Sequence, residues 1–298
     1  MYDSIIIGAG TAGLTASIYA ARAGLNVLVL EGVAYGGQIV NTLNIENYPG
    51  LFRVSGYDFS KSLYEQAKEL GAEIKMEEVI SVDLVGEVKK VVTTKANYLA
   101  KTIIIATGRQ SRQLDIEDTK KYIGKGLSYC ATCDGNFFKN KDVAVIGGGD
   151  TALDDAMYLS QIVNKVYLVH RRNEFRGNKN TVKKLENKDN VEFILDANLK
   201  KINGEDRIES IDVEYKDKSV DNLKIDGLFI AIGQVPNTGM FENVLDLDEY
   251  GYIISADTST SIPGVYVAGD VRTKDVRQLT TAANDGTIAA TRVIQYLE

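Results

Sequence analysis

Short apolar runs that end in glycine recur along this chain of 298 residues. Residues 5–7 are three isoleucines before Gly8, and residues 143–146 read Val-Ala-Val-Ile before a second glycine. Further runs of this kind lie at residues 102–109, 228–237 and 264–271. Apolar runs without polar alternation are typical of parallel strands that are buried on both faces. The pattern therefore predicts an α/β protein built on parallel sheets.

A helical pattern follows the first run, and a second apolar strand covers residues 27–30. Between the first strand and the helix, Gly8, Gly10 and Gly13 stand in the order Gly-x-Gly-x-x-Gly. Such glycines let the backbone approach a pyrophosphate, which the N-terminus of the helix then faces. Because strand, turn, helix and strand occur in the required order, the segment predicts a dinucleotide site.

The same order recurs in the middle of the chain. Gly147, Gly149 and Ala152 follow the strand at residues 143–146, and a helical pattern leads to a further apolar strand at residues 166–169. Alanine in place of the third glycine still allows the helix to pack closely on the strand. A second dinucleotide site is therefore predicted.

The two motifs differ at the end of their second strand. Glu31 and His170 each lie 23 residues after the first glycine of their motif. The second motif continues with basic residues, at Arg171, Arg172 and Arg176. A carboxylate accepts hydrogen bonds from a ribose 2′-hydroxyl and repels a 2′-phosphate, whereas arginines bind that phosphate. The first site is predicted to take FAD or NAD and the second NADPH; a solvated basic loop is the alternative for the arginines.

The chain has two cysteines, Cys130 and Cys133, and both lie in the stretch CATCDG between the two motifs. Such a pair can be a structural disulfide, part of a metal site or a redox-active pair. A zinc site takes about four ligands, and the chain has one histidine, so no metal site is expected. Stable disulfides are rare in the cytosol, where a CxxC is more often catalytic. A redox-active pair is therefore predicted.

Asp134 follows the cysteine pair directly. It is the local candidate for acid–base work, because the single histidine lies far away in the sequence. A helix that starts at the motif and continues to Phe137 and Phe138 would lower the thiolate pKa through its N-terminal dipole. A helix-capping carboxylate is the alternative interpretation of Asp134.

Charge and composition narrow the range of partners. The net charge of −7 and the isoelectric point near 5.0 argue against nucleic acid or an anionic membrane as a partner. The first ten residues lack the basic and apolar segments of a signal peptide, and no apolar run reaches about 18 residues. We therefore expect a cytoplasmic protein.

The positions of the strand-plus-glycine endings predict one domain inserted into another. The runs at residues 102–109 and 228–237 would each close a nucleotide-binding unit. The last run ends in Gly269 and Asp270, and this carboxylate can face the ribityl chain of a flavin. We expect two Rossmann-like, three-layer domains, with residues 1–112 and 243–298 for the first nucleotide and residues 113–242 for NADPH and the CxxC.

The order of motifs resembles that of the low-molecular-weight thioredoxin reductases of bacterial type. The motifs are GAGTAG, GGQ, NYPG, ATG, CATCDG, GGGDTA, HRRNEFR, AIGQVPN, VAGDVR and RQ, and they cover essentially the whole chain. CATCDG between the two nucleotide motifs is the most specific of them. The resemblance implies a homodimer with FAD in the first domain. It also implies that a hydride passes from NADPH to FAD, and electrons then pass to the Cys130–Cys133 disulfide and to oxidised thioredoxin.

The resemblance implies roles for single residues as well. The adenosine half of FAD would be held by Gly8, Gly10, Gly13 and Glu31. The flavin would be contacted by Gly36, Gly37, Gln38, Asn47, Asp270 and Gln278. NADPH would be held by Gly149, Asp150, Thr151, Arg171, Arg172 and Arg176. Cys133 would face the flavin, Cys130 would attack the thioredoxin disulfide, and Asp134 would donate or accept the proton.

Two other functions are compatible with parts of this pattern. One is a flavoprotein reductase of the same fold that is fed by ferredoxin or serves another disulfide acceptor. Ferredoxin-fed relatives tend to lose the GxGxxA and HRRxxFR residues, and this chain keeps both. The other is a non-catalytic flavin-binding module or redox sensor, which would need the nucleotide motifs but no turnover.

Overall fold

The computed structural model describes residues 1–298 except 43, 113, 115, 117 and 118. Residue 113, the predicted first residue of the inserted domain, therefore lies outside the described part. The chain forms two compact units. Unit 1 comprises Met1–Val40, Ile45–Gln110 and Val235–Glu298, and unit 2 comprises Asn41–Asn44 and Ser111–Gln234.

Unit 1 is built on a seven-stranded sheet in the order β3-β2-β1-β6-β5-β4, in which β17 also pairs with β6. Its strands are β1 (Tyr2–Ile7), β2 (Val27–Glu31), β3 (Glu73–Met76), β4 (Val79–Asp83), β5 (Lys89–Thr93), β6 (Asn97–Ile105) and β17 (Val265–Val267). The strands β1, β2, β3, β6 and β17 pair in parallel, whereas β4 and β5 are antiparallel additions. The parallel strands β1, β2, β6 and β17 coincide with the apolar runs of the sequence.

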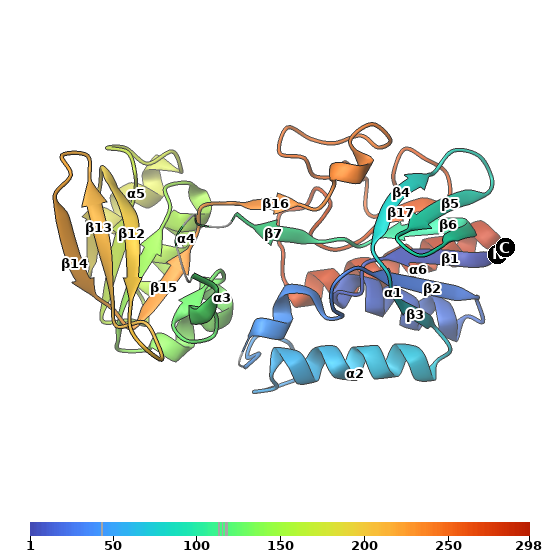
Figure 1. Cartoon of the computed structure of the whole chain (residues 1–298), viewed down its shortest axis with the longest axis horizontal. Coiled ribbons are helices and arrows are strands. Elements are labelled where there is room, and N and C mark those ends of the chain that lie inside the picture. The colour runs from blue at the N-terminus through green and yellow to red at the C-terminus, as the bar shows by residue number, and fades with distance from the viewer. Residues whose placement is uncertain (43, 113, 115, 117–118) are drawn as a thin grey trace. The chain divides into compact units, whose positions relative to one another are not determined.

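Helices cover one face of this sheet, and they are α1 (Thr11–Arg22), α2 (Gly56–Glu69) and α6 (Leu279–Leu297) (Figure 1). Ile6, Val29 and Ile104 point toward these helices, and their neighbours Ile5 and Leu28 point into a second core on the opposite face. Because successive strand residues point to opposite faces, a continuous apolar run fills both cores. Short 3₁₀ helices are η1 (Gly37–Asn41) and η4 (Gly239–Phe241).

Unit 2 contains a five-stranded parallel sheet in the order β11-β10-β9-β15-β8 and a three-stranded antiparallel sheet. The parallel strands are β8 (Leu127–Ser128), β9 (Asp142–Ile146), β10 (Lys165–Val169), β11 (Val191–Ile194) and β15 (Gly227–Ile230). The antiparallel strands are β12 (Ala197–Asn203), β13 (Ser210–Tyr215) and β14 (Val220–Lys224). The helices are α3 (Ala131–Asp134), α4 (Asp150–Leu159) and α5 (Lys179–Glu186), with the 3₁₀ helices η2 (Thr119–Tyr122) and η3 (Gly135–Phe138).

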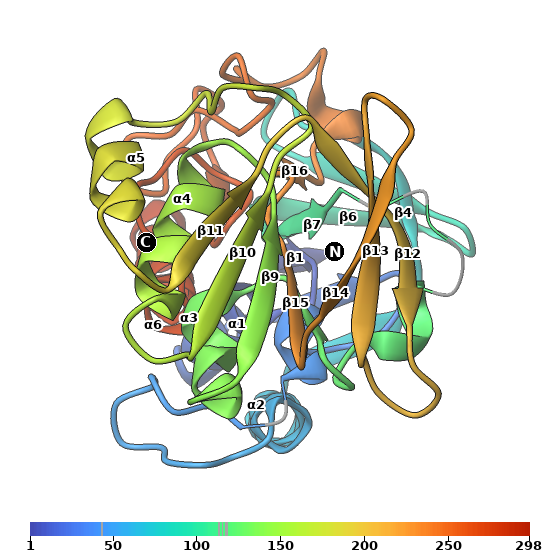
Figure 2. The same ribbon diagram turned by 90° about the vertical axis from the view of Figure 1, so that its left-hand side faces the viewer.

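The parallel sheet is the middle layer of unit 2 (Figure 2). One face packs on the antiparallel sheet, where Ala144 and Leu228 meet Ile211. The other face packs on the helices, where Val145 meets Leu153 of α4. The sequence analysis did not identify the three-stranded sheet, because its strands alternate polar and apolar residues and carry no glycine motif.

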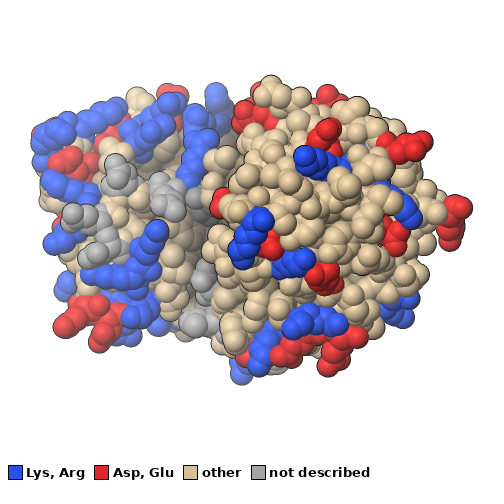
Figure 3. Space-filling view, turned by 45° about the vertical axis from the view of Figure 1, so that its right-hand side comes forward, with Lys and Arg blue, Asp and Glu red and all other residues tan. Residues whose placement is uncertain are grey.

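The strands β7 (Arg109–Ser111) and β16 (Gln234–Pro236) lie at two of the points where the chain passes from one unit to the other, and they pair with each other. The predicted α/β fold on parallel sheets is confirmed by both units. No helix in the described part of the chain is long and apolar enough to cross a membrane. Charged side chains of both signs are scattered over the face seen in Figure 3.

Candidate functional site

The first glycine turn lies in unit 1 between β1 and α1. Gly8 has a φ of +108°, and a Cβ there would lie 2.4 Å from the carbonyl oxygen of Ala106. A Cβ on Gly13 would lie 1.9 Å from the carbonyl oxygen of Gly8. Both positions therefore need glycine, since a side chain would push the helix off the strand.

Gly10 is the N-cap residue of α1, and no side chain caps this helix end. A Cβ on Gly10 would meet no described atom within 4 Å, so the space over this residue is open. The first amide groups of the helix point into that space, where they can bind an anionic group. This geometry fits the pyrophosphate of a dinucleotide.

Glu31 ends β2 and holds the glycine turn in place. Its two carboxylate oxygens accept hydrogen bonds from the backbone N–H groups of Ala9, at 2.9 Å, and Val33, at 3.1 Å. A carboxylate has about four acceptor sites, so two further hydrogen bonds remain possible for ribose hydroxyls. The predicted role of Glu31 is compatible with this arrangement.

Gly36 and Gly37 lie against the same turn. The N–H of Gly36 donates to the carbonyl oxygen of Ala9 at 2.7 Å, and a Cβ on Gly37 would lie 3.5 Å from the Cα of Gly10. Gly36 has a φ of +103°, a conformation that other residues rarely adopt. The structure thus brings the second glycine pair onto the first turn.

Asp270 and Gln38 are connected through Arg109, which the sequence analysis did not single out. The guanidinium Nε of Arg109 lies 3.2 Å from a carboxylate oxygen of Asp270. The side-chain amide of Gln38 donates to the backbone carbonyl of Arg109. Arg109 follows the ATG segment at the end of β6, and a charged residue directly after a strand end was the available signal.

Asn47 and Gln278 meet across 231 positions of sequence. The amide nitrogen of Asn47 donates to the side-chain oxygen of Gln278 at 3.2 Å. Gln278 is the N-cap residue of α6 and forms a capping box with Thr281. The ten residues predicted for the first nucleotide therefore lie in one unit, in three hydrogen-bonded or packed groups.

The second glycine turn lies in unit 2 between β9 and α4. Gly149 is the N-cap residue of α4, no side chain caps it, and a Cβ there would meet no described atom within 4 Å. A Cβ on Gly147 would lie 2.7 Å from the Cβ of Ala152. Because Gly147 has no side chain, the space beside it can hold the methyl group of Ala152 at the position of the third glycine. Thr151 is exposed in the first turn of α4. The arrangement again fits a pyrophosphate.

The loop that carries the arginines is attached to this turn. The N–H of Arg176 donates to the carbonyl oxygen of Gly148 at 2.8 Å, and the N–H of Asn178 donates to a carboxylate oxygen of Asp150 at 2.6 Å. Asp150 therefore anchors the loop with its side chain. Arg171 and Arg172 are exposed, and no acidic side chain of the described residues lies within ion-pair distance of either.

His170 has a structural position beneath the glycine turn. Its ring is buried and stacks on Phe175, with 5.4 Å between the ring centroids. A Cβ on Gly148 would lie 2.2 Å from the ring. Burial lowers the pKa of His170, and the positive charges of the neighbouring arginines add to this. The imidazole is therefore neutral at pH 7.

Cys130 and Cys133 form a disulfide at the start of α3. Cys130 is the N-cap residue, and its carbonyl oxygen accepts from the N–H of Asp134 at 3.1 Å. The helical segment considered in the sequence analysis does continue to Phe138, but as one α-helical turn that passes into the 3₁₀ helix η3 at Gly135. A helix of one turn has few aligned peptide dipoles, so its N-terminus should lower the pKa of the thiols less than a longer helix would.

Asp134 lies largely buried behind the disulfide. One carboxylate oxygen accepts from the hydroxyl of Ser128 at 2.6 Å, and the other is buried without a hydrogen-bond partner among the described residues. Burial raises the pKa of Asp134, and the Ser128 hydrogen bond lowers it in part. Asp134 makes no capping hydrogen bond to η3. This environment suits a group that exchanges a proton.

Known proteins are similar to this chain over its full length. A family model for pyridine nucleotide-disulphide oxidoreductases matches residues 2–286. A thioredoxin reductase of Peptoclostridium acidaminophilum is 41% identical over 309 aligned positions, which cover 100% of this chain and 98% of that protein. The crystal structure of thioredoxin reductase from Streptococcus pyogenes has 43% identity and a TM-score of 0.95, covering 100% of this chain and 98% of that one. A bifunctional thioredoxin reductase/thioredoxin of Mycobacterium leprae is 40% identical, covering 100% of this chain and 66% of that protein.

This chain belongs to the thioredoxin reductases of the pyridine nucleotide-disulphide oxidoreductase family. It is therefore an oxidoreductase, and its family implies a flavin and a pyridine nucleotide as cofactors. The predicted family and the predicted two-domain Rossmann-type fold are both confirmed.

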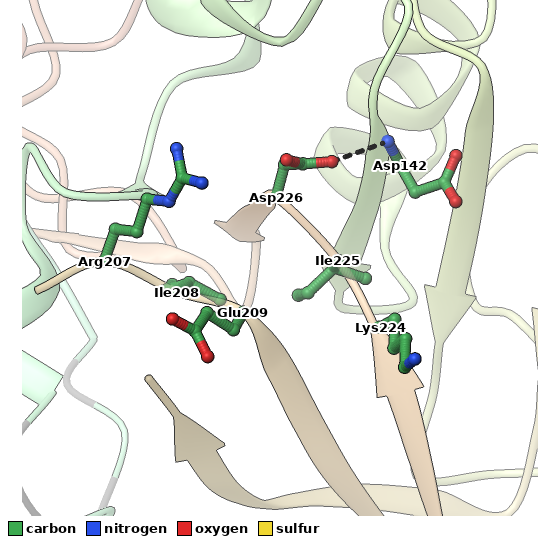
Figure 4. A pocket seen from close by; sticks show the side chains of 7 residues that line it. All are labelled: Asp142, Arg207, Ile208, Glu209, Lys224, Ile225 and Asp226. Carbon is green, nitrogen blue, oxygen red and sulfur yellow. Dashed lines mark hydrogen bonds between the residues drawn. The ribbon is translucent and has the colours of Figure 1, made fainter. Parts of the chain in front are cut away.

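A separate pocket of about 260 Å³ lies in unit 2 at the start of β9 (Figure 4). Its lining residues are Asp142, Arg207, Ile208, Glu209, Lys224, Ile225 and Asp226. The N–H of Asp142 donates to Asp226 at 3.4 Å within it. The second glycine turn follows the opposite, carboxyl end of β9, so this pocket is not part of the candidate site.

Proposed function

We propose that this chain is an NADPH-dependent thioredoxin-disulfide reductase that carries FAD in unit 1 and NADPH in unit 2. The observation that supports it most directly is the Cys130–Cys133 disulfide with Asp134 buried behind it, in the unit that also carries the arginine loop. A pair of thiols beside a proton-exchanging carboxyl is what thiol–disulfide exchange requires.

The proposed cofactor sites follow the described geometry. In unit 1, the adenosine half of FAD would bind at Gly8, Gly10, Gly13 and Glu31, and the flavin at Gly36, Gly37, Gln38, Asn47, Asp270 and Gln278. In unit 2, NADPH would bind at Gly149, Asp150, Thr151, Arg171, Arg172 and Arg176. The two exposed arginines beside a neutral His170 favour a 2′-phosphate over a free 2′-hydroxyl.

When bound, the nucleotide and the flavin supply two electrons to the disulfide. The residues of this chain carry out the following exchange. Cys130 attacks the disulfide of the partner as a thiolate and forms a mixed disulfide. Cys133 then attacks the sulfur of Cys130, which restores the Cys130–Cys133 bond and releases the partner as a dithiol. Asp134 takes the proton of one thiol and returns it to one partner sulfur, and the proton of the other thiol passes to the second partner sulfur, so that two electrons and two protons leave the enzyme per turnover.

The proposed partner is thioredoxin. The relative from Mycobacterium leprae carries the name of a bifunctional thioredoxin reductase/thioredoxin, which supports this choice. We also propose a homodimer in the cytoplasm, as the family resemblance implies. A ferredoxin-fed reductase is not favoured, because the arginine loop remains attached to a complete second glycine turn.

The proposal is tested with the purified yellow protein. Heat-released flavin should be FAD, and anaerobic NADPH should bleach the visible flavin band at least about tenfold faster than NADH at equal concentration. Addition of thioredoxin should then give continuous NADPH oxidation. Cys130→Ser and Cys133→Ser should each lose thioredoxin reduction and keep flavin bleaching. Bleaching by neither nucleotide would contradict the assignment of unit 2, and a single turnover without continued oxidation would indicate a redox sensor.

A further inference from the structure

Ser128 has one hydroxyl that contacts both parts of the redox turn. It is the last residue of β8, and only 6% of its surface is exposed. Its oxygen lies 2.6 Å from a carboxylate oxygen of Asp134 and accepts from the backbone N–H of Cys130 at 3.0 Å. The sequence analysis did not identify this residue, because serine at the end of a strand is common.

The direction of these two hydrogen bonds follows from their distances. The N–H of Cys130 can only donate, so it occupies a lone pair of the Ser128 oxygen. The hydroxyl proton can point to Asp134 at 2.6 Å or to the carbonyl oxygen of Cys130 at 3.3 Å. The shorter contact to a carboxylate is a charge-assisted bond and is the stronger of the two. Ser128 therefore donates to Asp134.

Few other charged groups near Asp134 could change the pKa of its carboxyl. The elements packed most closely on α3 are η3, which carries no titratable side chain, and α4, which carries Asp150, Asp154, Asp155 and Tyr158. Within its own segment, the titratable groups are Tyr129 and the two cysteines. None of these is a cause of the raised pKa of Asp134, which reflects burial opposed by the Ser128 hydrogen bond.

We propose that Ser128 is a positioning residue that holds the Asp134 carboxyl and the backbone of Cys130 in one arrangement for proton transfer during thiol–disulfide exchange. The inference rests on the proposed function, because it assumes that Asp134 exchanges the proton. In each turnover two electrons and two protons pass from the Cys130–Cys133 dithiol to the thioredoxin disulfide. Asp134 carries one of these protons, and Ser128 keeps its own proton throughout.

The test compares variants that differ in the hydroxyl. Ser128→Ala removes it, and Ser128→Thr and Ser128→Val form a matched pair of the same shape with and without it. The first readout is the pH profile of thioredoxin reduction by the holoenzyme. The rise or fall of this profile that disappears in Asp134→Asn, called its Asp134 limb, is assigned to the titration of Asp134. In Ser128→Ala and Ser128→Val this limb should move to higher pH by about one unit, because the bond that stabilises the carboxylate is lost. Ser128→Thr should keep the position of the unmodified enzyme.

The second readout does not depend on activity. The infrared carbonyl band of protonated Asp134, identified as the band that Asp134→Asn removes, is titrated in the oxidised holoenzyme. It should persist to higher pH in Ser128→Ala and Ser128→Val. An unchanged titration, or an equal shift in Ser128→Thr and Ser128→Val, would overturn the inference. Absence of thioredoxin reduction in the unmodified enzyme would instead contradict the proposed function, whatever the infrared result. Flavin content and bleaching by NADPH show that each variant is folded.

Discussion

Glu31 and His170 occupy equivalent positions in the two glycine motifs and differ in what they do. Glu31 accepts hydrogen bonds from two backbone N–H groups of its own turn and keeps acceptor capacity for a ribose. His170 is buried under its turn, so the charge at that strand end comes from Arg171 and Arg172. An acid at one strand end and arginines after the other therefore support the proposed choice of a ribose hydroxyl in unit 1 and a 2′-phosphate in unit 2.

The double variant Arg171→Ala/Arg172→Ala should raise the KM for NADPH by about 10–100-fold, since a hydrogen bond to a charged group contributes about 1.5–3 kcal/mol. The KM for NADH should change little. Steady-state kinetics with both nucleotides measure this. Arg207→Ala, at the pocket of Figure 4, is the control and should change neither value. Equal increases for NADPH and NADH would contradict the assignment to the 2′-phosphate.

Asp155 on α4 gives a pH-dependent prediction. Burial raises its pKa to about 7, and the charge of Asp154 adds to this. A carboxyl with a raised folded-state pKa binds more protons when folded, so its effect on stability becomes unfavourable as the pH rises from about 4 to about 7. The free energy of unfolding of Asp155→Asn, relative to that of the unmodified protein, should therefore increase by on the order of 2 kcal/mol from pH 4 to pH 8.

Urea unfolding of the holoenzyme at a series of pH values measures this difference. Asp154→Asn is the matched control, because Asp154 is exposed on the same helix and should give a smaller difference. A difference between Asp155→Asn and the unmodified protein that stays constant with pH would show that folding does not raise the pKa of Asp155.

At the level of elements, α1 and α6 cross at very short range. Gly286 of α6 lies so close to α1 that a Cβ would be 2.3 Å from the carbonyl oxygen of Ala12. The capping box at Gln278 starts α6 at the point where the side chain of Gln278 accepts from Asn47. A shift of α6 away from α1 would therefore also move Gln278, a residue of the proposed flavin site.

Gly286→Ala should lower the free energy of unfolding by about 1–3 kcal/mol, because the added methyl group forces two helix backbones apart. This outcome is opposite to the gain of about 1 kcal/mol that alanine brings in an exposed helix. Chemical denaturation and bound flavin content measure the effect. Gly239→Ala in η4 is the control, since its Cβ would meet no described atom within 4 Å and its φ is not positive. Equal stability of the two variants would contradict the close crossing.

On the scale of the whole molecule, each compact unit holds one glycine turn with an uncapped helix start. Gly10 and Gly149 are the N-cap residues of these helices, and both have open space where a Cβ would stand. Each turn is supported by contacts within its own unit, through Glu31 in unit 1 and Asp150 in unit 2. The two nucleotide sites should therefore be separable by mutation.

Gly10→Val and Gly149→Val form a reciprocal pair. Gly10→Val should fill the proposed FAD space, so the protein should purify without flavin and still bind to immobilised 2′,5′-ADP. Gly149→Val should remain yellow and lose retention on that resin. Absorbance spectra and affinity chromatography of the full chain measure both. Loss of both properties in either variant would show that the sites depend on one another.

The sequence by itself determined the local chemistry: two strand–glycine–helix turns, an acid after one and arginines after the other, and a cysteine pair followed by an aspartate. These features are readable because each depends on residues within about one supersecondary unit. The tertiary structure decided which side chains meet over long distances, as with Arg109 and Asp270 or Asn47 and Gln278. It also decided that Ser128 donates a hydrogen bond to Asp134 and that the helix at the disulfide changes from α-helical to 3₁₀ geometry after one turn. Spacing in a sequence specifies periodicity within an element, whereas hydrogen-bond partners depend on the path that the chain takes between elements.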